Sequence, residues 1–277
     1  SDGTADVLAH VADIARWANA TVHVLYVADT ARDSVTVVES GTVDVLVGKG
    51  EDVVAAATDE LAGRGVECDS DVVQGNPAPS IADYATEYGH DLIVMATHGR
   101  EGLSRFLESS VTEKVVRLAD VPVLTARRRE DEVLAFPYED VLLPVDGSDG
   151  ATRAARHGLD LAAALDATAH VLAVADDESL GPDVRSVLSE RDLEARAGDA
   201  IEEVTAMADE RGVSDVVEHI AHGDPTDEVR TAVETTGADV VVMGTTGRRG
   251  VDRILLGSVA EATLRSAPVP VVTVGEN

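Results

Sequence analysis

The stretch Val240–Val259 reads V-V-V-M-G-T-T-G-R-R-G-V-D-R-I-L-L-G-S-V and predicts how the chain around it folds. A β-branched apolar run ends at Met243 and indicates a strand, and Gly244 and Gly247 then predict a tight turn. Gly257–Ser258 opens an apolar-periodic segment that indicates a helix. Glycines let the backbone approach a ligand closely, and free N–H groups at a helix start favour an anion. The spacing therefore predicts a phosphate cradle.

Length and composition favour a folded chain of two ordinary domains. The 277 residues are rich in alanine and valine, which suits a parallel sheet covered by small-residue helices. The formal net charge of −30 disfavours binding to nucleic acid or to an anionic membrane surface. Only Lys49 and Lys114 are lysines. A composition with many acidic residues and so few lysines resembles that of haloarchaeal proteins. The salt-rich cytoplasm of haloarchaea would screen the repulsion among the acidic side chains.

Cysteine usage and apolar runs indicate a cytoplasmic protein. Cys68 is the single cysteine, which excludes an internal disulfide framework and fits a reducing compartment. No apolar run is long enough to span a bilayer, and no signal peptide is recognisable. We therefore expect no membrane partner and no nucleic-acid partner.

The two halves of the chain repeat one unit. The period is too long for a solenoid, so it indicates domain duplication. The matching blocks are Thr21–Asp29 with Thr168–Asp176, Val73–Pro77 with Ile220–Pro225, Leu92–Gly99 with Val240–Gly247, and Val121–Thr125 with Val269–Thr273. We expect a first unit at residues 1–128, a charged, proline-containing linker at 129–139, and a second unit at 140–277.

Strands and helices alternate in the second unit, which predicts a doubly wound parallel sheet. Ligands of such sheets bind beyond the carboxyl ends of the strands, where the strand order reverses. The expected strands are Val141–Val145, Ala169–Val174, Asp215–Ala221, Ala238–Met243 and Val271–Val274; the expected helices are Ala151–Leu165, one covering much of Asp183–Arg211, Pro225–Thr236 and Ser258–Ser266.

The first unit lacks a counterpart of its central strand. Ser1–Thr4 aligns without gaps on Ser148–Ala151, so Val141–Val145 and Asp146 have no equivalent. We expect a truncated start rather than a natural design; a first unit that leans on its neighbour is the alternative. On the following helix, Trp17 is predicted to be a core anchor.

Three blocks of the second half, in this order, resemble the universal stress protein family. They are L-L-P-V-D-G-S around Asp146, the Gly223–Pro225 turn, and the G-x-x-G-x9-G-S spacing of Gly244–Ser258. The recurring blocks extend the resemblance to almost the whole chain. It implies two Rossmann-like domains in tandem, of the adenine nucleotide alpha hydrolase-like type. It also implies that the two closing strands meet, so that the halves form a pseudo-dimer within one chain; a further homodimer stays open.

The resemblance to the ATP-binding branch of that family implies an ATP site, with or without Mg, in the second unit. Asp146 would lie near the ribose, Val174 would offer backbone groups to adenine, Gly244 and Gly247 would line the ribose and first phosphates, and Gly257, Ser258 and Val259 would bind phosphates. Beside the loop, Arg248 and two further arginines, Arg249 and Arg253, are notable in so acidic a chain. Two interpretations are equally favoured: at least one of these arginines contacts a phosphate, or all of them pair with surface acids.

The corresponding loop of the first unit is degenerate. Ala96 replaces the first glycine, and Ser109 stands where the second unit has Gly257. Glu108 places an acid beside the expected phosphates. We therefore expect weak or absent nucleotide binding in the first unit.

The leading hypothesis is a universal stress protein-like, ATP-binding regulatory or stress-response protein with little or no turnover. No nucleophile, base and orienting residue form a convincing catalytic set, and no metal site is indicated; His23 and His170 are predicted to be core residues rather than ligands. Two alternatives stay open: a slow ATP hydrolase using Asp146 and a divalent metal, and a module that binds a protein partner and no nucleotide.

Overall fold

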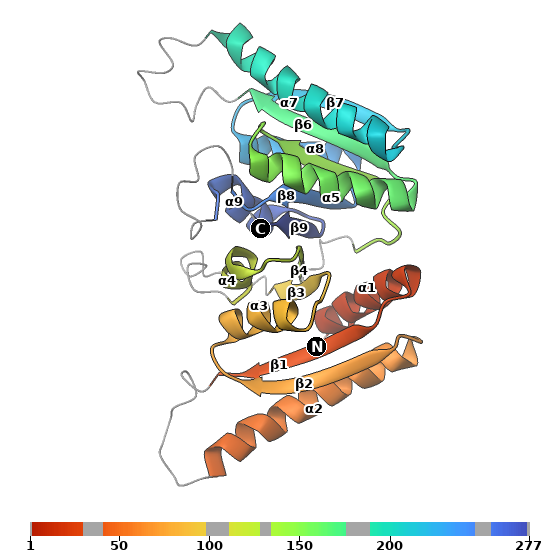
Figure 1. The fold of residues 1–277 in the computed structure, drawn as a ribbon, viewed down its shortest axis with the longest axis vertical. Coiled ribbons are helices and arrows are strands. Elements are labelled where there is room, and N and C mark those ends of the chain that lie inside the picture. Colours follow the sequence, from red (N-terminus) through yellow and green to blue (C-terminus); the bar gives the residue numbers. More distant parts are fainter. Residues whose placement is uncertain are drawn as a thin grey trace.

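Strands and helices alternate along the chain, and their order confirms the predicted α/β class with parallel sheets (Figure 1). The computed structural model describes residues 2–29, 41–97, 111–127, 134–175, 189–246 and 256–275. In the first unit the elements are α1 (Asp2–Ala18), β1 (Val22–Ala28), α2 (Gly41–Gly63), β2 (Cys68–Gln74), α3 (Pro77–Glu87), β3 (Ile93–Thr97), α4 (Val111–Leu118) and β4 (Val123–Arg127). In the second they are β5 (Asp140–Val145), α5 (Asp149–Leu165), β6 (Thr168–Ala175), α7 (Glu190–Arg211), β7 (Val216–His222), α8 (Pro225–Thr236), β8 (Val240–Gly244), α9 (Ser258–Ser266) and β9 (Val271–Val274).

Local chemistry explains where the helices of the second unit begin and end. Ser148 caps α5 by accepting a hydrogen bond from the N–H of Ala151, as is usual for a serine before a helix. Asp224 caps α8 directly before Pro225, whose fixed φ suits the first turn. Gly212 and Gly237 end α7 and α8 in the left-handed conformation, which a glycine adopts without strain.

The main sheet has seven strands in the order β3-β4-β9-β8-β5-β6-β7. Within the second unit all neighbouring strands are parallel, and β5 lies between β6 and β8. Helices α5 and α7 cover one face of this part of the sheet, and α8 and α9 cover the other. The chain runs outward from β5 to β7 and then returns to β8 on the opposite side of β5. The strand order therefore reverses beside β5, where doubly wound sheets bind ligands.

The two units join through their closing strands, as the resemblance implied. β4 and β9 pair antiparallel, with Leu124 opposite Val272. Two buried threonines add side-chain hydrogen bonds between these strands. The hydroxyl of Thr125 donates to the carbonyl of Val271, and that of Thr273 donates to the carbonyl of Val123. One hydrophobic core runs across the junction and contains buried residues of α3, α4, α8 and α9. The halves therefore share a sheet and a core.

The sheet of the first unit is split. β1 and β2 form a separate two-stranded parallel sheet, whereas β3 is an edge strand of the seven-stranded sheet (Figure 1). In the second unit β5 fills the equivalent position between β6 and β8. Among the described residues no strand lies between β1 and β3. Helix α1 connects the two parts: Ile14 packs against the core of the large sheet, and Val11 packs against a small cluster beneath β1.

Aromatic side chains pack α1 against the segment that leads into β5. The rings of Trp17 and Phe136 meet edge to face with centroids 5.8 Å apart. His10 and Tyr138 are 2 % and 3 % exposed and share a hydrogen bond of 2.8 Å between Nε2 and the phenolic oxygen. Trp17 itself is 45 % exposed, so its assignment as a core anchor is wrong. Its ring packs on this connecting segment at the surface.

The buried contact of His10 with Tyr138 predicts that the stability of the folded protein depends on pH. Burial lowers the pKa of His10 below its ordinary value of 6.5, and its Nδ1 is buried without a partner, so an imidazolium there would be costly. Since the unfolded chain takes up the proton first, stability present above pH 6.5 is lost as the pH falls below that value. We expect wild-type protein to lose more unfolding free energy between pH 7.5 and 5.5 than His10→Gln. Denaturant unfolding at both pH values measures this difference, and equal losses would contradict it.

Candidate functional site

The predicted site residues come from several elements that meet at the carboxyl end of the sheet. Asp146 follows β5, Val174 lies near the end of β6, and Gly244 is the last residue of β8. Hydrogen bonds bring α9 to the same place: the N–H of Thr245 donates to the carbonyl of Val274 (3.1 Å), and the N–H of Gly257 donates to the carbonyl of Thr245 (2.8 Å). The start of α9 is thereby fixed at the end of β8.

Gly244 allows β8 to touch the first turn of α5. A Cβ at Gly244 would lie 2.9 Å from the backbone carbon and oxygen of Gly150 and 3.2 Å from the nitrogen of Ala151. A Cβ at Gly150 would in turn lie 2.7 Å from the carbonyl oxygen of Thr246. These are closer than Cβ atoms approach backbone, so both glycines are required for this contact. Packing alone therefore requires a glycine at position 244, whether or not a ligand binds there.

Helix α9 begins without a side-chain cap. Its N-cap is Gly257 (φ −62°, ψ 144°), which has no side chain to accept from the first-turn amides. By contrast, α5, α7 and α8 are capped by Ser148, Ser189 and Asp224. Ser258 is exposed, and Gly257 and Val259 are half-buried. Uncapped amides and the positive end of the helix dipole form a local anion-binding geometry.

Asp146 organises the turn between β5 and α5. Its Oδ1 accepts a hydrogen bond of 3.0 Å from the N–H of Ser148, while Gly147 adopts a positive φ of 73°. The side chain is exposed at the strand end. This turn brings the carboxylate near the start of α5, whose Gly150 contacts the β8 end. Val174 is half-buried one strand further along, between Ala173 and Ala175.

Parts of the predicted site lie outside the described residues. These are Gly247 and Arg248 of the second unit, together with Arg249 and Arg253, and the corresponding degenerate loop positions Glu108 and Ser109 of the first.

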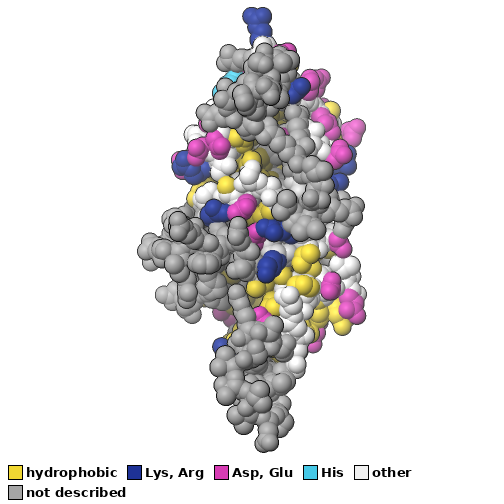
Figure 2. Space-filling view, turned by 90° about the vertical axis from the view of Figure 1, so that its left-hand side faces the viewer, with side chains coloured by type: hydrophobic (Ala, Val, Ile, Leu, Met, Phe, Trp, Pro, Cys, Tyr) yellow, Lys and Arg dark blue, Asp and Glu magenta, His cyan; other side chains and the backbone are white. Residues whose placement is uncertain are grey.

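Figure 2 looks onto the end of the molecule at which the carboxyl ends of the strands lie. On its described surface, cationic as well as anionic side chains are visible among apolar ones, so the strong net acidity is not uniform over this face (Figure 2).

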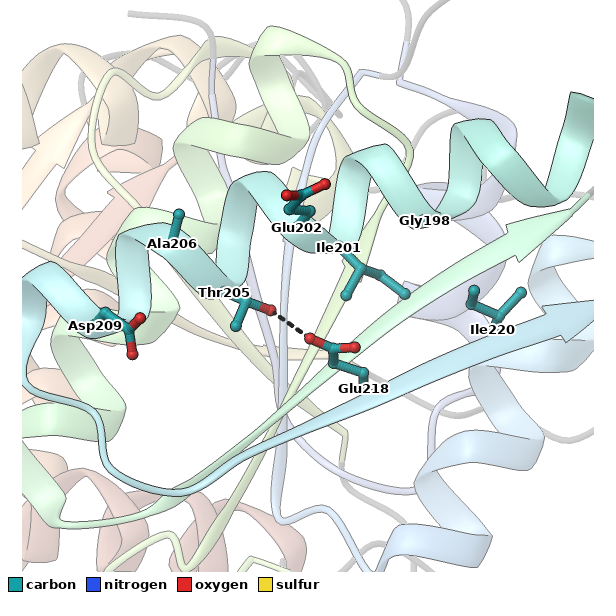
Figure 3. A pocket seen from close by; sticks show the side chains of 8 residues that line it. All are labelled: Gly198, Ile201, Glu202, Thr205, Ala206, Asp209, Glu218 and Ile220. Atoms are coloured by element: carbon teal, nitrogen blue, oxygen red, sulfur yellow. Dashed lines mark hydrogen bonds between the residues drawn. The ribbon is translucent and has the colours of Figure 1, made fainter.

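A hollow of about 450 Å³ lies elsewhere, between α7 and β7 (Figure 3). The hydroxyl of Thr205 donates to Glu218 (3.0 Å) across it, and Ile201 and Ile220 form an apolar part. Its charged lining side chains, Glu202, Asp209 and Glu218, are all acidic. Such a lining repels phosphate. The described residues therefore favour the β8–α9 region over this hollow for an anionic ligand.

Metal and membrane sites find no support in the described part of the chain. It holds no group of three or more His, Cys, Asp or Glu side chains able to hold a metal ion. None of its helices is both long and apolar enough to cross a membrane.

His170, predicted to be a core residue, is indeed buried, but it also joins a polar chain from Asp140 (2.8 Å) to His219 (3.1 Å).

Sequence reasoning missed the contribution of Gly150 and Thr245. Gly150 makes room for the carbonyl of Thr246, and the buried Thr245 accepts from the amide that starts α9. A signal for Gly150 existed, because Gly3 occupies the corresponding position of the first unit. A backbone carbonyl such as that of Thr245 leaves no trace in the sequence.

Comparison with known proteins identifies two copies of one family pattern. The model of the universal stress protein family matches residues 1–127 and 137–275. A universal stress protein of Mycobacterium tuberculosis is 32% identical over 221 residues, which cover 76% of this chain and 70% of the relative. One from Methanocaldococcus jannaschii is 36% identical over 140 residues, half of this chain and 82% of the relative.

Solved structures show the same fold. The crystal structure of a universal stress protein from Archaeoglobus fulgidus covers 100% of this chain and 96% of its own, with a TM-score of 0.75. Its sequence identity to this chain is 22%, so this similarity concerns the architecture. Both tandem units therefore have a counterpart in a known structure.

Proposed function

Because the chain belongs to the universal stress protein family, we propose that its second unit binds ATP and acts as a nucleotide-binding regulatory or stress-response module. The uncapped amino end of α9, fixed to the end of β8 by Gly257 and Thr245, carries the proposal. In this reading the amides of Ser258 and Val259 and the serine hydroxyl bind phosphates. The bound nucleotide extends past Asp146 toward Val174, across the point where the strand order reverses.

The proposal assigns binding to this unit without assigning a reaction. Asp146 already accepts the turn hydrogen bond from the N–H of Ser148, and the sequence offers no convincing set of nucleophile, base and orienting residue. Mg, where present, would be held chiefly by the phosphates, and Asp146 is the carboxylate that we propose for contact with it. Gly247 and Arg248 would complete the phosphate loop. We place this function in the cytoplasm, in keeping with the sequence expectations.

Hydrogen exchange locates the nucleotide directly. We expect ATP–Mg, added in molar KCl to screen the net charge, to slow amide exchange at residues 257–260 and at the turn after Asp146. The first unit should exchange at unchanged rates. Protection confined to the first unit, or to the acidic hollow beside α7, would refute the assignment. GTP at the same concentration serves as the comparison for base preference.

A further inference from the structure

Strand β7 forms an open end of the seven-stranded sheet. It pairs with β6 on one side, and no other described strand pairs with its outer side. Val217 and Ile220 of this strand are 41 % and 48 % exposed. An edge strand that exposes large apolar side chains is a template for pairing with another chain, so proteins commonly place charges on such edges. At these two positions β7 has no such protection.

The first unit differs at the corresponding strand. By the repeat, β2 corresponds to β7 and lies at the end of the two-stranded sheet. Asp69 of β2 corresponds to Val217 and is charged and exposed. Val72 corresponds to Ile220 but is only half-buried rather than exposed. The apolar outer edge is therefore a property of the second unit.

Side chains of the first unit fill the place that is hollow in the second. Gly50 of α2 corresponds by the repeat to Gly198 of α7. A Cβ at Gly50 would lie 2.6 Å from Cδ1 of Tyr26 and 2.9 Å from Cγ1 of Val72, so α2 packs directly on the strands there. A Cβ at Gly198 would meet nothing within 4 Å. The second unit has Ala173 in place of the tyrosine, and the space beside Gly198 is open.

This hollow combines an apolar wall with carboxylates (Figure 3). Ile201 of α7 and Ile220 of β7 form the apolar part, and Glu218 lies beside them. The side chains of Glu202 and Asp209, which also line the hollow, form no hydrogen bond or ion pair with another residue that the structure describes. Arginine and lysine suit such a lining, because their hydrocarbon stems pack on apolar surface while their cationic heads pair with acids.

Net charge decides which kind of chain can pair with this edge. The formal net charge is −30, and the charged side chains that line the hollow are all acidic. A second copy of the chain that paired through β7 would bring like charges together, which is unfavourable. A basic segment is attracted by the same field. The occupant that fits is therefore a cationic polypeptide rather than a second copy.

We propose that β7 binds an extended segment of a basic partner protein, which adds a strand to the outer edge of the sheet. Backbone hydrogen bonds to β7 supply affinity, and side chains that alternate between the two faces of the added strand select its sequence. On the face covered by α7, an arginine or lysine enters the hollow and pairs with Glu218. On the opposite face, apolar residues cover Val217.

The test uses a short labelled peptide in which valine and arginine alternate, titrated into the full chain in molar KCl. This salt shortens the Debye length to about 3 Å and so suppresses unspecific attraction to the acidic surface. We expect saturable one-to-one binding by fluorescence anisotropy, with slower amide exchange at residues 216–222. A peptide in which valine and glutamate alternate should not bind.

Two variants of the chain impair the site in different ways. Glu218→Gln should weaken binding of the valine–arginine peptide about tenfold, because it removes a charged acceptor and keeps the shape of the side chain. Gly198→Leu should weaken binding at least as much, because its side chain occupies the hollow from a position where a Cβ meets nothing within 4 Å. Glu210→Gln, at an exposed acid of α7 outside the hollow, removes the same charge and should bind like wild type.

Three results overturn the proposal. The first is absence of saturable binding to a chain whose circular dichroism shows it folded. The second is equal affinity for a valine–arginine peptide interrupted by proline, which cannot form the added strand and would show that only the cationic charge is bound. The third is self-association through β7, seen by analytical ultracentrifugation together with slow exchange of β7 in the absence of peptide, which would assign this edge to a second copy of the chain.

Discussion

Replacing Gly257 with glutamate is expected to weaken binding of ATP–Mg about a hundredfold or more. The substitution places a carboxylate at the amino end of α9, where the helix has no side-chain cap and where the proposed phosphates bind. A like charge brought against a bound anion costs several kcal/mol, and about 2.8 kcal/mol corresponds to a hundredfold loss of affinity. The backbone angles of Gly257 suit any residue, so the fold should persist.

A matched control comes from the first unit. Asn76 is the N-cap of α3, with similar backbone angles (φ −77°, ψ 118°) and no side-chain cap hydrogen bond. Asn76→Glu therefore adds the same charge to another uncapped helix start. Isothermal titration calorimetry should find its affinity for ATP–Mg close to that of wild type. Equal loss in both variants would mean that net charge, rather than the α9 site, governs binding.

The second large effect concerns stability. Gly158→Ala is expected to lower the free energy of unfolding of the second unit by about 1–3 kcal/mol, because overpacking a filled core forces side chains off their preferred positions. The new Cβ would lie 2.2 Å from Cδ2 of Leu143 and 3.2 Å from Cβ of Val242, both of which are fully buried. Gly198→Ala in α7 is the control: a Cβ there meets nothing within 4 Å, so it should stabilise by about 0.5–1 kcal/mol.

A double-mutant cycle assigns the cause of that loss. Leu143→Ala alone should cost about 2–5 kcal/mol through the cavity it leaves. Combined with Gly158→Ala, the total should fall short of the sum by about 1 kcal/mol or more, because the added methyl occupies vacated space. Denaturant unfolding measures all four proteins. Strict additivity would show that Leu143 is not the residue that Gly158 accommodates.

Much of the second unit was predictable from sequence because its local signals agree. Helices α8 and α9 have the predicted bounds, Pro225–Thr236 and Ser258–Ser266. The closing strand β9 also has the predicted bounds. That this strand meets β4 was expected only through the family resemblance, since strand pairing between distant segments has no local signal; the antiparallel direction is a finding of the structure.

Other features depend on tertiary neighbours that the sequence does not reveal. Trp17 is apolar and lies on a helix, which favours burial, but it packs against Phe136 at the surface. Gly244 fits a ligand loop, yet the structure also requires it for the contact with Gly150. The division of the described strands of the first unit, with β1 and β2 in one sheet and β3 and β4 in the other, emerged only from the pairing of strands.

The most direct test of the account is calorimetric titration of ATP–Mg into the wild-type chain in molar KCl. We expect saturable binding with about one site per chain, because the second unit has the uncapped α9 start and the intact loop spacing. Two sites would show that the degenerate loop of the first unit also binds nucleotide. No heat of binding to folded protein at several temperatures would contradict the ATP assignment and favour the alternative of a module that binds a protein partner and no nucleotide.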